Sequence, residues 1–309
     1  MHMPSKNQPR AAVRKPGHAQ PPTVSGHWLL AALSWTVLAA AFCAWGALCL
    51  LFWQGSWQLL YHPSAKIART PAAVGLAFDP AGFAATDTGL LRLQGWWISA
   101  PPDAPLSGYT VLYFHDRDGN LSDTVNALAA LNDVGVNVLA FDYRGYGQSQ
   151  FVRPSEAHWR QDAAWALQYL TATRHIDPRT IVLDGSGLGA NLALETAAAH
   201  SELAGAILNS PLENPMDAVF NDARARMVPA RLLTSDRYSL DAPAAALRIP
   251  SLWVLPAPEG QKINHPQKEP EAFQKVSAPK SLIWQPASKT AEQDYVDALE
   301  YWLGHLPSR

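Results

Sequence analysis

The sequence predicts an α/β domain with a mostly parallel sheet, preceded by one long apolar helix. From residue 86 onward, apolar runs typical of strands alternate with segments that have helical periodicity. Most of the strand runs are short and continuously apolar, as expected when helices cover both faces of a sheet. Residues 16–65 contain no charged side chain, and most of residues 27–53 are apolar. These features predict one globular domain behind one membrane-spanning segment.

Residues 27–53 are predicted to be a transmembrane anchor. At about 1.5 Å per residue, a helix of this length covers roughly 40 Å, more than the roughly 30 Å of a bilayer's hydrocarbon core. Trp28, Trp53 and Trp57 stand near its ends, where aromatic side chains favour the membrane interface. A cleaved signal peptide is the alternative, but its apolar region usually has about 7 to 15 residues. We therefore expect the anchor to be retained.

The N-terminal tail, residues 1–26, is predicted to be disordered and cytoplasmic. It has no acidic residue and four basic ones, Lys6, Arg10, Arg14 and Lys15. By the positive-inside rule, this places the globular domain on the extracytoplasmic side. Both cysteines, Cys43 and Cys49, lie within the span, so no disulfide is expected in the domain. The formal net charge of −2, without a basic stripe after residue 27, argues against nucleic acid as a partner.

After a predicted linker over residues 54–85, the α/β domain occupies residues 86–309. Its expected strands are 90–99, 109–115, 136–142, 180–184, 205–209, 251–255 and 280–285. Its expected helices are 121–134, 155–175, 188–200, 217–234 and 290–303. Ser155 is a good N-cap residue for the second helix. The fourth helix has an alternative interpretation, as part of a small cap around residues 213–245.

The segment Thr180–Ala190 has the pattern of a buried strand, a glycine-rich turn and a helix. Such a turn with the sequence G-x-S-x-G is a nucleophile elbow. If Gly185 and Gly189 are its two small positions, the middle residue is Gly187, and Ser186 falls one place early. Glycine has no side chain with which to form a covalent acyl intermediate. It also adopts a strained turn more readily than serine does.

Three segments together resemble the motifs of α/β-hydrolases. Residues 113–122, Tyr-Phe-His-Asp-Arg-Asp-Gly-Asn-Leu-Ser, resemble the loop that forms part of the oxyanion hole. Residues 141–149, Phe-Asp-Tyr-Arg-Gly-Tyr-Gly-Gln-Ser, resemble the turn one strand later, and residues 185–189 resemble the elbow. The resemblance extends over about residues 55–304, to the membrane-anchored, small-cap branch related to serine aminopeptidases and acyl esterases. It implies an α/β-hydrolase fold, a mostly parallel sheet flanked by helices, after one N-terminal transmembrane helix.

The resemblance also implies a catalytic triad in the chain order serine, acid, histidine. At these three positions the sequence has Gly187, Glu259 and Thr290. Glu259 is a carboxylate that matches the acid only in part of its motif. Thr290 cannot be a general base near neutral pH and is better explained as the N-cap of the last helix. No catalytic residue set is therefore intact, and Ser186 is the fallback nucleophile.

The oxyanion hole is implied to use the backbone N–H of Leu188 and an N–H at Asp116 or Arg117. Asp116 stands where the family usually has glycine, and its carboxylate would repel an oxyanion. The sequence thus predicts a membrane-anchored pseudo-hydrolase that binds a small acyl, peptide or lipid-like ligand or a partner. It predicts no cofactor and no metal. The alternative is an active esterase, thioesterase or peptidase with a displaced nucleophile.

Overall fold

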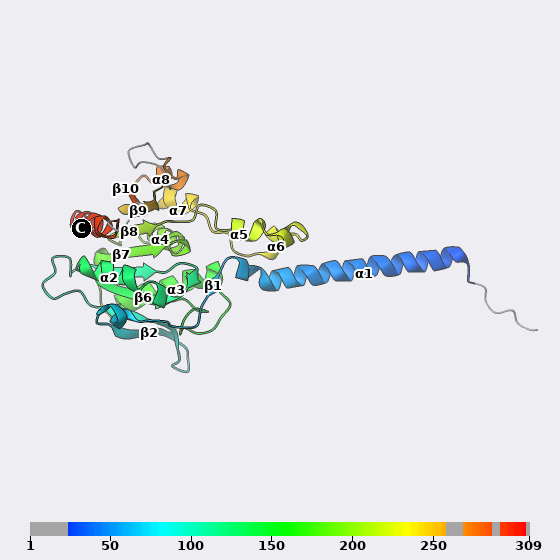
Figure 1. Ribbon diagram of the computed structural model, residues 1–309, viewed down its shortest axis with the longest axis horizontal. Helices are drawn as coiled ribbons and strands as arrows, with labels where there is room; N and C mark the ends of the chain where they lie inside the picture. Colours follow the sequence, from blue (N-terminus) through cyan, green and yellow to red (C-terminus); the bar gives the residue numbers. More distant parts are fainter. Residues whose placement is uncertain (1–23, 258–267, 286–290, 307–309) are drawn as a thin grey trace, which may run out of the picture. The chain divides into compact units, whose positions relative to one another are not determined.

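The computed structural model describes residues 24–257, 268–285 and 291–306. Glu259 and Thr290, the predicted triad-equivalent acid and base, lie outside these residues. The chain divides into two compact units, Met1–Leu48 and Cys49–Arg309. The second unit contains the whole sheet and all of the motifs discussed above (Figure 1).

Helix α1 (Gly26–Gly55) continues into the short 3₁₀ helix η1 (Ser56–Leu59). The stretch Gly26–Leu59 contains an 18-residue window with a mean hydropathy of 2.0, so it is long and apolar enough to cross a membrane. A signal sequence meets the same criteria of length and composition. The predicted span at residues 27–53 falls within α1, although Cys49–Gly55 already belong to the second compact unit.

The main sheet has eight strands in the order β10-β9-β8-β7-β4-β6-β3-β2. Neighbours from β10 to β6 are parallel, whereas β3 pairs antiparallel with both β6 and β2. The sheet is therefore mostly parallel, as the sequence predicts. Its strands are β2 (Asp79–Ala85), β3 (Leu91–Ile98), β4 (Thr110–Phe114), β6 (Asn137–Asp142), β7 (Ile181–Ser186), β8 (Gly205–Asn209), β9 (Ser251–Pro256) and β10 (Lys280–Gln285).

The prediction of a linker over residues 54–85 is wrong. Besides η1, this segment contains the short strand β1 (His62–Pro63), the 3₁₀ helix η2 (Pro71–Val74) and strand β2. Strand β2 is an edge strand in which only Ala81 and Phe83 are buried. An edge strand rich in alanine, glycine and proline lacks the apolar alternation that identifies strands in a sequence. The aromatic ring of Phe83 stacks on Tyr169 at 4.8 Å and holds β2 in place.

Helices cover both faces of the sheet (Figure 1). Helices α2 (Val125–Asp133) and α9 (Ala291–Gly304) share one apolar core with the sheet, whereas α3 (Glu156–Gln168), α4 (Leu188–Ala199) and α7 (Asp241–Ala246) pack on the other side. The Ser155 hydroxyl accepts the His158 N–H and caps α3, as expected. Helix α3 ends in a π turn (Tyr169–Thr173), and the 3₁₀ turn η3 (Leu121–Asp123) precedes α2. Helices α7 and α8 (Glu271–Lys275) were not predicted.

The predicted helix 217–234 is three short helical pieces. These are α5 (Asp217–Phe220), η6 (Ala223–Arg226) and α6 (Ala230–Leu233). The Asp222 carboxylate accepts the Arg224 N–H and starts a new turn, and Pro229 interrupts the chain again before α6. The prediction of one continuous helix is therefore wrong, and the alternative of a small cap fits the irregular backbone.

Candidate active site

Strand β7 ends in a tight turn whose central residue is Gly187. This glycine has a φ of +56° and is the N-cap of α4. A Cβ atom at Gly185 would lie 2.3 Å from the Gly189 carbonyl oxygen, and one at Gly189 would lie 2.3 Å from the Phe114 carbonyl oxygen. Residues 185 and 189 therefore have to be glycine because backbone atoms pass directly beside them.

The side chain of Asp116 fills the space next to Gly187. A Cβ atom at Gly187 would lie 2.2 Å from both Cγ and Oδ1 of Asp116. The same Oδ1 accepts hydrogen bonds from the backbone N–H groups of Leu188 and Arg117, each at 2.7 Å. We call these two donors the amide pair. The carboxylate thus occupies both the amide pair and the place of any side chain at residue 187.

The surroundings of the Asp116 carboxylate act on its charge in opposite directions. Burial raises the pKa of Asp116 above its usual value, and the hydrogen bonds from Leu188 and Arg117 offset part of that rise. The Leu188 N–H also belongs to the first turn of α4, where the helix dipole favours a negative group. The amide pair therefore binds a carboxyl group that belongs to the protein itself.

The loop that carries Asp116 is held by hydrogen bonds from two buried tyrosines. The Tyr143 hydroxyl donates to the His115 carbonyl oxygen at 3.0 Å, and the Tyr146 hydroxyl donates to the Arg117 carbonyl oxygen at 2.9 Å. Just beyond this loop, β1 pairs with the two-residue strand β5 (Asp118–Gly119). Because both tyrosines are fully buried, Asp116 is presented by a fixed segment of backbone rather than by a loose surface loop.

His115 faces the interior beside this loop. Its Nδ1 lies 2.7 Å from the Asp116 carbonyl oxygen, and its Nε2 lies 3.6 Å from Oδ1 of Asp142. Among the described residues, Nε2 has no hydrogen-bond partner. Burial lowers the pKa of His115 to about 4, so the imidazole is neutral at physiological pH. This ring interacts with the main chain and with Asp142, and neither nitrogen contacts the Asp116 carboxylate.

The turn at residues 142–149 is a structural support. Oδ1 of Asp142 accepts the Leu121 N–H at 2.9 Å, and a Cβ atom at Gly147 would overlap the Asp142 carboxylate. Nε of Arg144 donates to Oδ1 of Asp162 at 2.6 Å. Burial raises the pKa of Asp142 to about 7 and that of Asp162 to about 6. These groups join the turn to α3 and to the segment before α2.

Ser186 lies on the other side of the strand from this arrangement. Because side chains alternate along a strand, Ser186 shares a face with Asp184, the face covered by α9. The Asn209 side-chain amide donates to Oδ1 of Asp184 at 2.7 Å, and burial raises the pKa of Asp184 to about 7. No hydrogen bond joins Ser186 to a histidine among the residues described here.

Sequence reasoning singled out Asp116, Arg117 and Leu188 but did not place the carboxylate inside the amide pair. The available signal was Asp116 itself, a charged residue at a usual glycine position. The two tyrosines that hold its loop, Tyr143 and Tyr146, were not recognised as supports. Their pattern in residues 141–149 was interpreted only as a turn.

Comparison with known proteins agrees with this architecture. The model of the serine aminopeptidase family S33 matches residues 109–300. An uncharacterized protein of Mycobacterium tuberculosis is 30% identical over 234 residues, which cover 72% of this chain and 79% of that protein. The uncharacterized protein YfhR of Salmonella typhi is 27% identical over 241 residues, covering 71% and 78%.

Solved structures with the same fold include esterases and hydrolases. The Pyrococcus furiosus esterase Pf2001 superposes with a TM-score of 0.59 at 16% identity and covers 81% of this chain and 99% of that one. An α/β-hydrolase from Vibrio vulnificus superposes with a TM-score of 0.54 at 21% identity, covering 74% and 81%. The family match extends over more than half of the sequence, and the parallel sheet with its glycine turn agrees with it. This chain therefore belongs to the serine aminopeptidase S33 family of α/β-hydrolases.

Proposed function

We propose that this chain is a membrane-anchored pseudo-hydrolase. It keeps the hydrolase fold, does not perform acyl transfer at the turn after β7, and acts by binding a small acyl, peptide or lipid-like ligand or a partner. One observation carries the proposal: the Asp116 carboxylate accepts the amide pair and occupies the side-chain space of Gly187.

Two separate requirements of acyl transfer are missing from this arrangement. Residue 187 offers no hydroxyl to attack a carbonyl carbon. The amide pair, which would stabilise the developing oxyanion, already binds a carboxylate of the same charge. Loss of a single oxyanion-hole donor typically costs about 100- to 1,000-fold in kcat, and here both donors are engaged. Glu259 at the acid position and Thr290 at the base position remain predictions from the sequence.

The test is covalent labelling of the full chain, extracted in mild detergent, with a fluorophosphonate that reacts with activated serines. We expect no labelling, because among the described residues no serine occupies the middle of the turn beside the amide pair, where Gly187 stands. The matched control is Ser186→Ala, which should give the same blank result. Labelling of the natural chain that disappears in Ser186→Ala would overturn the proposal and favour the displaced-nucleophile enzyme.

The proposal includes retention of α1 in the membrane, with residues 1–26 in the cytoplasm and the globular domain outside. Its support is the length and apolar character of α1 and the four basic residues before it. The intact mass of protein extracted from membranes distinguishes the alternatives. A retained anchor leaves the full 33.6 kDa, whereas cleavage as a signal peptide removes the segment. Protease protection of sealed vesicles tests the orientation.

A further inference from the structure

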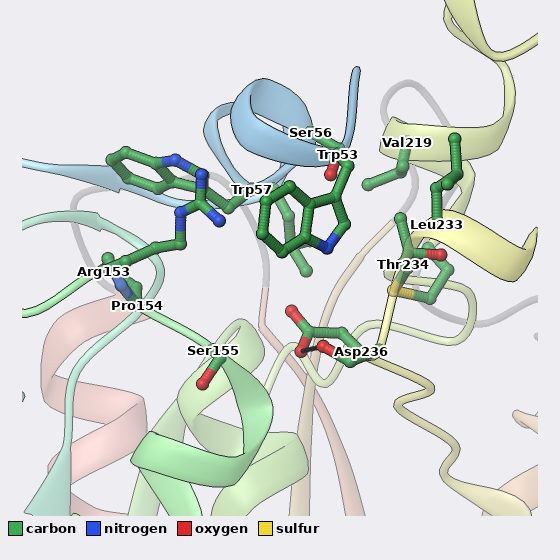
Figure 2. A pocket seen from close by; sticks show the side chains of 13 residues that line it. Trp53, Ser56, Trp57, Arg153, Pro154, Ser155, Val219, Leu233, Thr234 and Asp236 are labelled. Carbon is green, nitrogen blue, oxygen red and sulfur yellow. Dashed lines mark hydrogen bonds between the residues drawn. The ribbon is translucent and has the colours of Figure 1, made fainter. Parts of the chain in front are cut away.

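The end of α1 packs on the cap within the second compact unit. A cavity of about 80 Å³ lies between them, and Figure 2 draws the side chains around it. The α1–η1 side contributes Trp53, Ser56, Trp57 and Leu60; the other side contributes Arg153, Pro154, Ser155, Met216, Val219, Leu233, Thr234, Ser235 and Asp236. The C-terminal end of the apolar helix therefore lies directly beside the cap and the loop at residues 151–155.

Two side chains next to this junction are unusually exposed for apolar residues. Phe151 is 88% exposed and Leu232 is 85% exposed, the largest fractions among the large apolar side chains of the described residues. On α1 itself, Trp35 is 73% exposed and Phe42 is 71% exposed. Phe151 lies two residues before Arg153, and Leu232 lies directly before Leu233, so both adjoin the cavity lining. Single exposed apolar side chains are common, and these two stand out because both adjoin the cavity beside the end of α1.

Exposed arginines accompany the two apolar side chains. The Arg153 guanidinium lies over the Trp53 ring at 5.9 Å and donates to the Gln54 carbonyl oxygen. Arg231 lies over the Phe220 ring at 5.0 Å. Arg226 and Arg231 are exposed and form no ion pair with any described residue, in contrast to Arg224, which pairs with Asp222 at 2.8 Å. We call Phe151, Arg153, Arg226, Arg231 and Leu232 the cap rim.

We propose that the cap rim docks on an anionic bilayer surface at the end of α1. Phe151 and Leu232 insert among the lipid headgroups, and the arginines contact lipid phosphates. Apolar side chains flanked by guanidinium groups are the chemistry that binds such an interface. The inference rests on the proposed anchor, whose last residues, Trp53 among them, line the same cavity within the second compact unit. It adds that the cap itself touches lipid.

The experiment uses the full chain in lipid nanodiscs. A polarity-sensitive fluorophore is attached at Leu232→Cys in a Cys43→Ser/Cys49→Ser background, and nitroxide-labelled lipids quench it on contact. Leu90→Cys, another exposed leucine position, 71% exposed, in the turn between β2 and β3, is the matched control. Discs of phosphatidylcholine alone are compared with discs that also contain phosphatidylglycerol.

In discs with phosphatidylglycerol, we expect at least threefold stronger quenching at residue 232 than at residue 90. Each basic residue near an anionic surface contributes about fivefold in binding. The double substitution Arg226→Glu/Arg231→Glu should therefore lower the equilibrium constant for docking of the cap rim on the disc by at least about tenfold. Arg248→Glu/Lys268→Glu, the same change in net charge away from the cavity lining, should leave it unchanged.

The outcomes separate the inference from the proposed function. A chain that enters the discs but shows equal quenching at residues 232 and 90 overturns the docking surface and leaves the anchor in place. A chain that does not co-elute with the discs overturns both the anchor and the docking surface. A label at residue 232 that is shielded from water but not quenched by lipid also overturns the inference and indicates a protein partner. None of these results depends on fluorophosphonate labelling.

Discussion

The carboxyl carbon of Asp116 lies 2.2 Å from the point that a Cβ atom at residue 187 would occupy. The two residues follow the ends of different strands, β4 and β7, which are neighbours in the sheet. A side chain at residue 187 and a carboxylate at residue 116 therefore exclude each other in this backbone. The absence of a nucleophile and the filled amide pair are two aspects of one packing arrangement.

Gly187→Ser should destabilise the protein by about 2 kcal/mol or more, because the new side chain meets Asp116 in a backbone with positive φ. Thermal unfolding of the full chain in mild detergent measures the loss. Asp116→Gly in the same chain should recover part of it, as a double-mutant cycle with a coupling of at least about 0.5 kcal/mol. Gly108→Ser, where nothing lies within 4 Å of an added Cβ, is the control. Additive effects of the two changes would contradict the mutual exclusion.

Asp116→Gly alone should cost about 1 to 3 kcal/mol, because the amide pair loses its acceptor. Acetate supplies a carboxylate of similar size and should raise the melting temperature of this variant in a concentration-dependent way. The natural chain should not respond, since its amide pair is occupied. Asp118→Gly, two residues away and exposed, serves as the control. An equal response to acetate in all three proteins would show that the amide pair does not select a carboxylate.

Asp184→Asn should change how stability depends on pH. Burial raises the pKa of Asp184 to about 7 in the folded protein, above its usual value of 3.8. Its folded state therefore binds a proton that the unfolded chain releases, and this contribution to stability is lost as pH rises from about 4 to about 7. The slope is at most about 1.4 kcal/mol per pH unit.

Residue 184 of the Asp184→Asn variant carries no charge at any pH, so the variant should gain thermal stability relative to the natural chain as pH rises from 5 to 8. Asp79→Asn, at an exposed position on β2, should change the unfolding temperature by the same amount at pH 5 and at pH 8. Unfolding temperatures at half-unit pH steps provide the comparison. A difference between Asp184→Asn and the natural chain that stays constant from pH 5 to pH 8 would contradict the prediction.

Glu156→Ala should loosen the cap. Oε2 of Glu156 accepts the backbone N–H groups of Arg237 at 2.6 Å and Tyr238 at 3.3 Å, and Glu156 is 4% exposed. Two backbone donors, one of them at the buried Tyr238, would lose their acceptor, at a cost of roughly 1 to 3 kcal/mol. Hydrogen exchange should accelerate at residues 230–238. Glu195→Ala removes the other carboxylate bound to Arg160, at 2.6 Å, and as a partly exposed pair should cost under about 1 kcal/mol. Equal hydrogen-exchange rates at residues 230–238 in both variants would contradict a stabilising role of the Glu156 hydrogen bonds.

Local patterns were enough to predict much of the fold. The strands over 205–209 and 280–285 have the predicted bounds, because continuous apolar runs bounded by turn residues identify buried strands. Strand β2 escaped prediction because an edge strand buries only two of its side chains. The helix expected over 217–234 breaks into three pieces because Asp222 and Pro229 start new turns, a local effect that overrides helical periodicity.

The sequence by itself determined the fold class and the glycine at residue 187. Both depend on residues close together in the chain, which fix the strand, the turn and the order of elements. Only the tertiary structure decided where the Asp116 carboxylate points. Its partners, Gly187 and Leu188, lie about 70 residues away, and sheet pairing between β4 and β7 brings them together. Hydrogen bonds from Tyr143 and Tyr146 then hold its loop at the turn. No local pattern records the direction of a side chain set by contacts across strands.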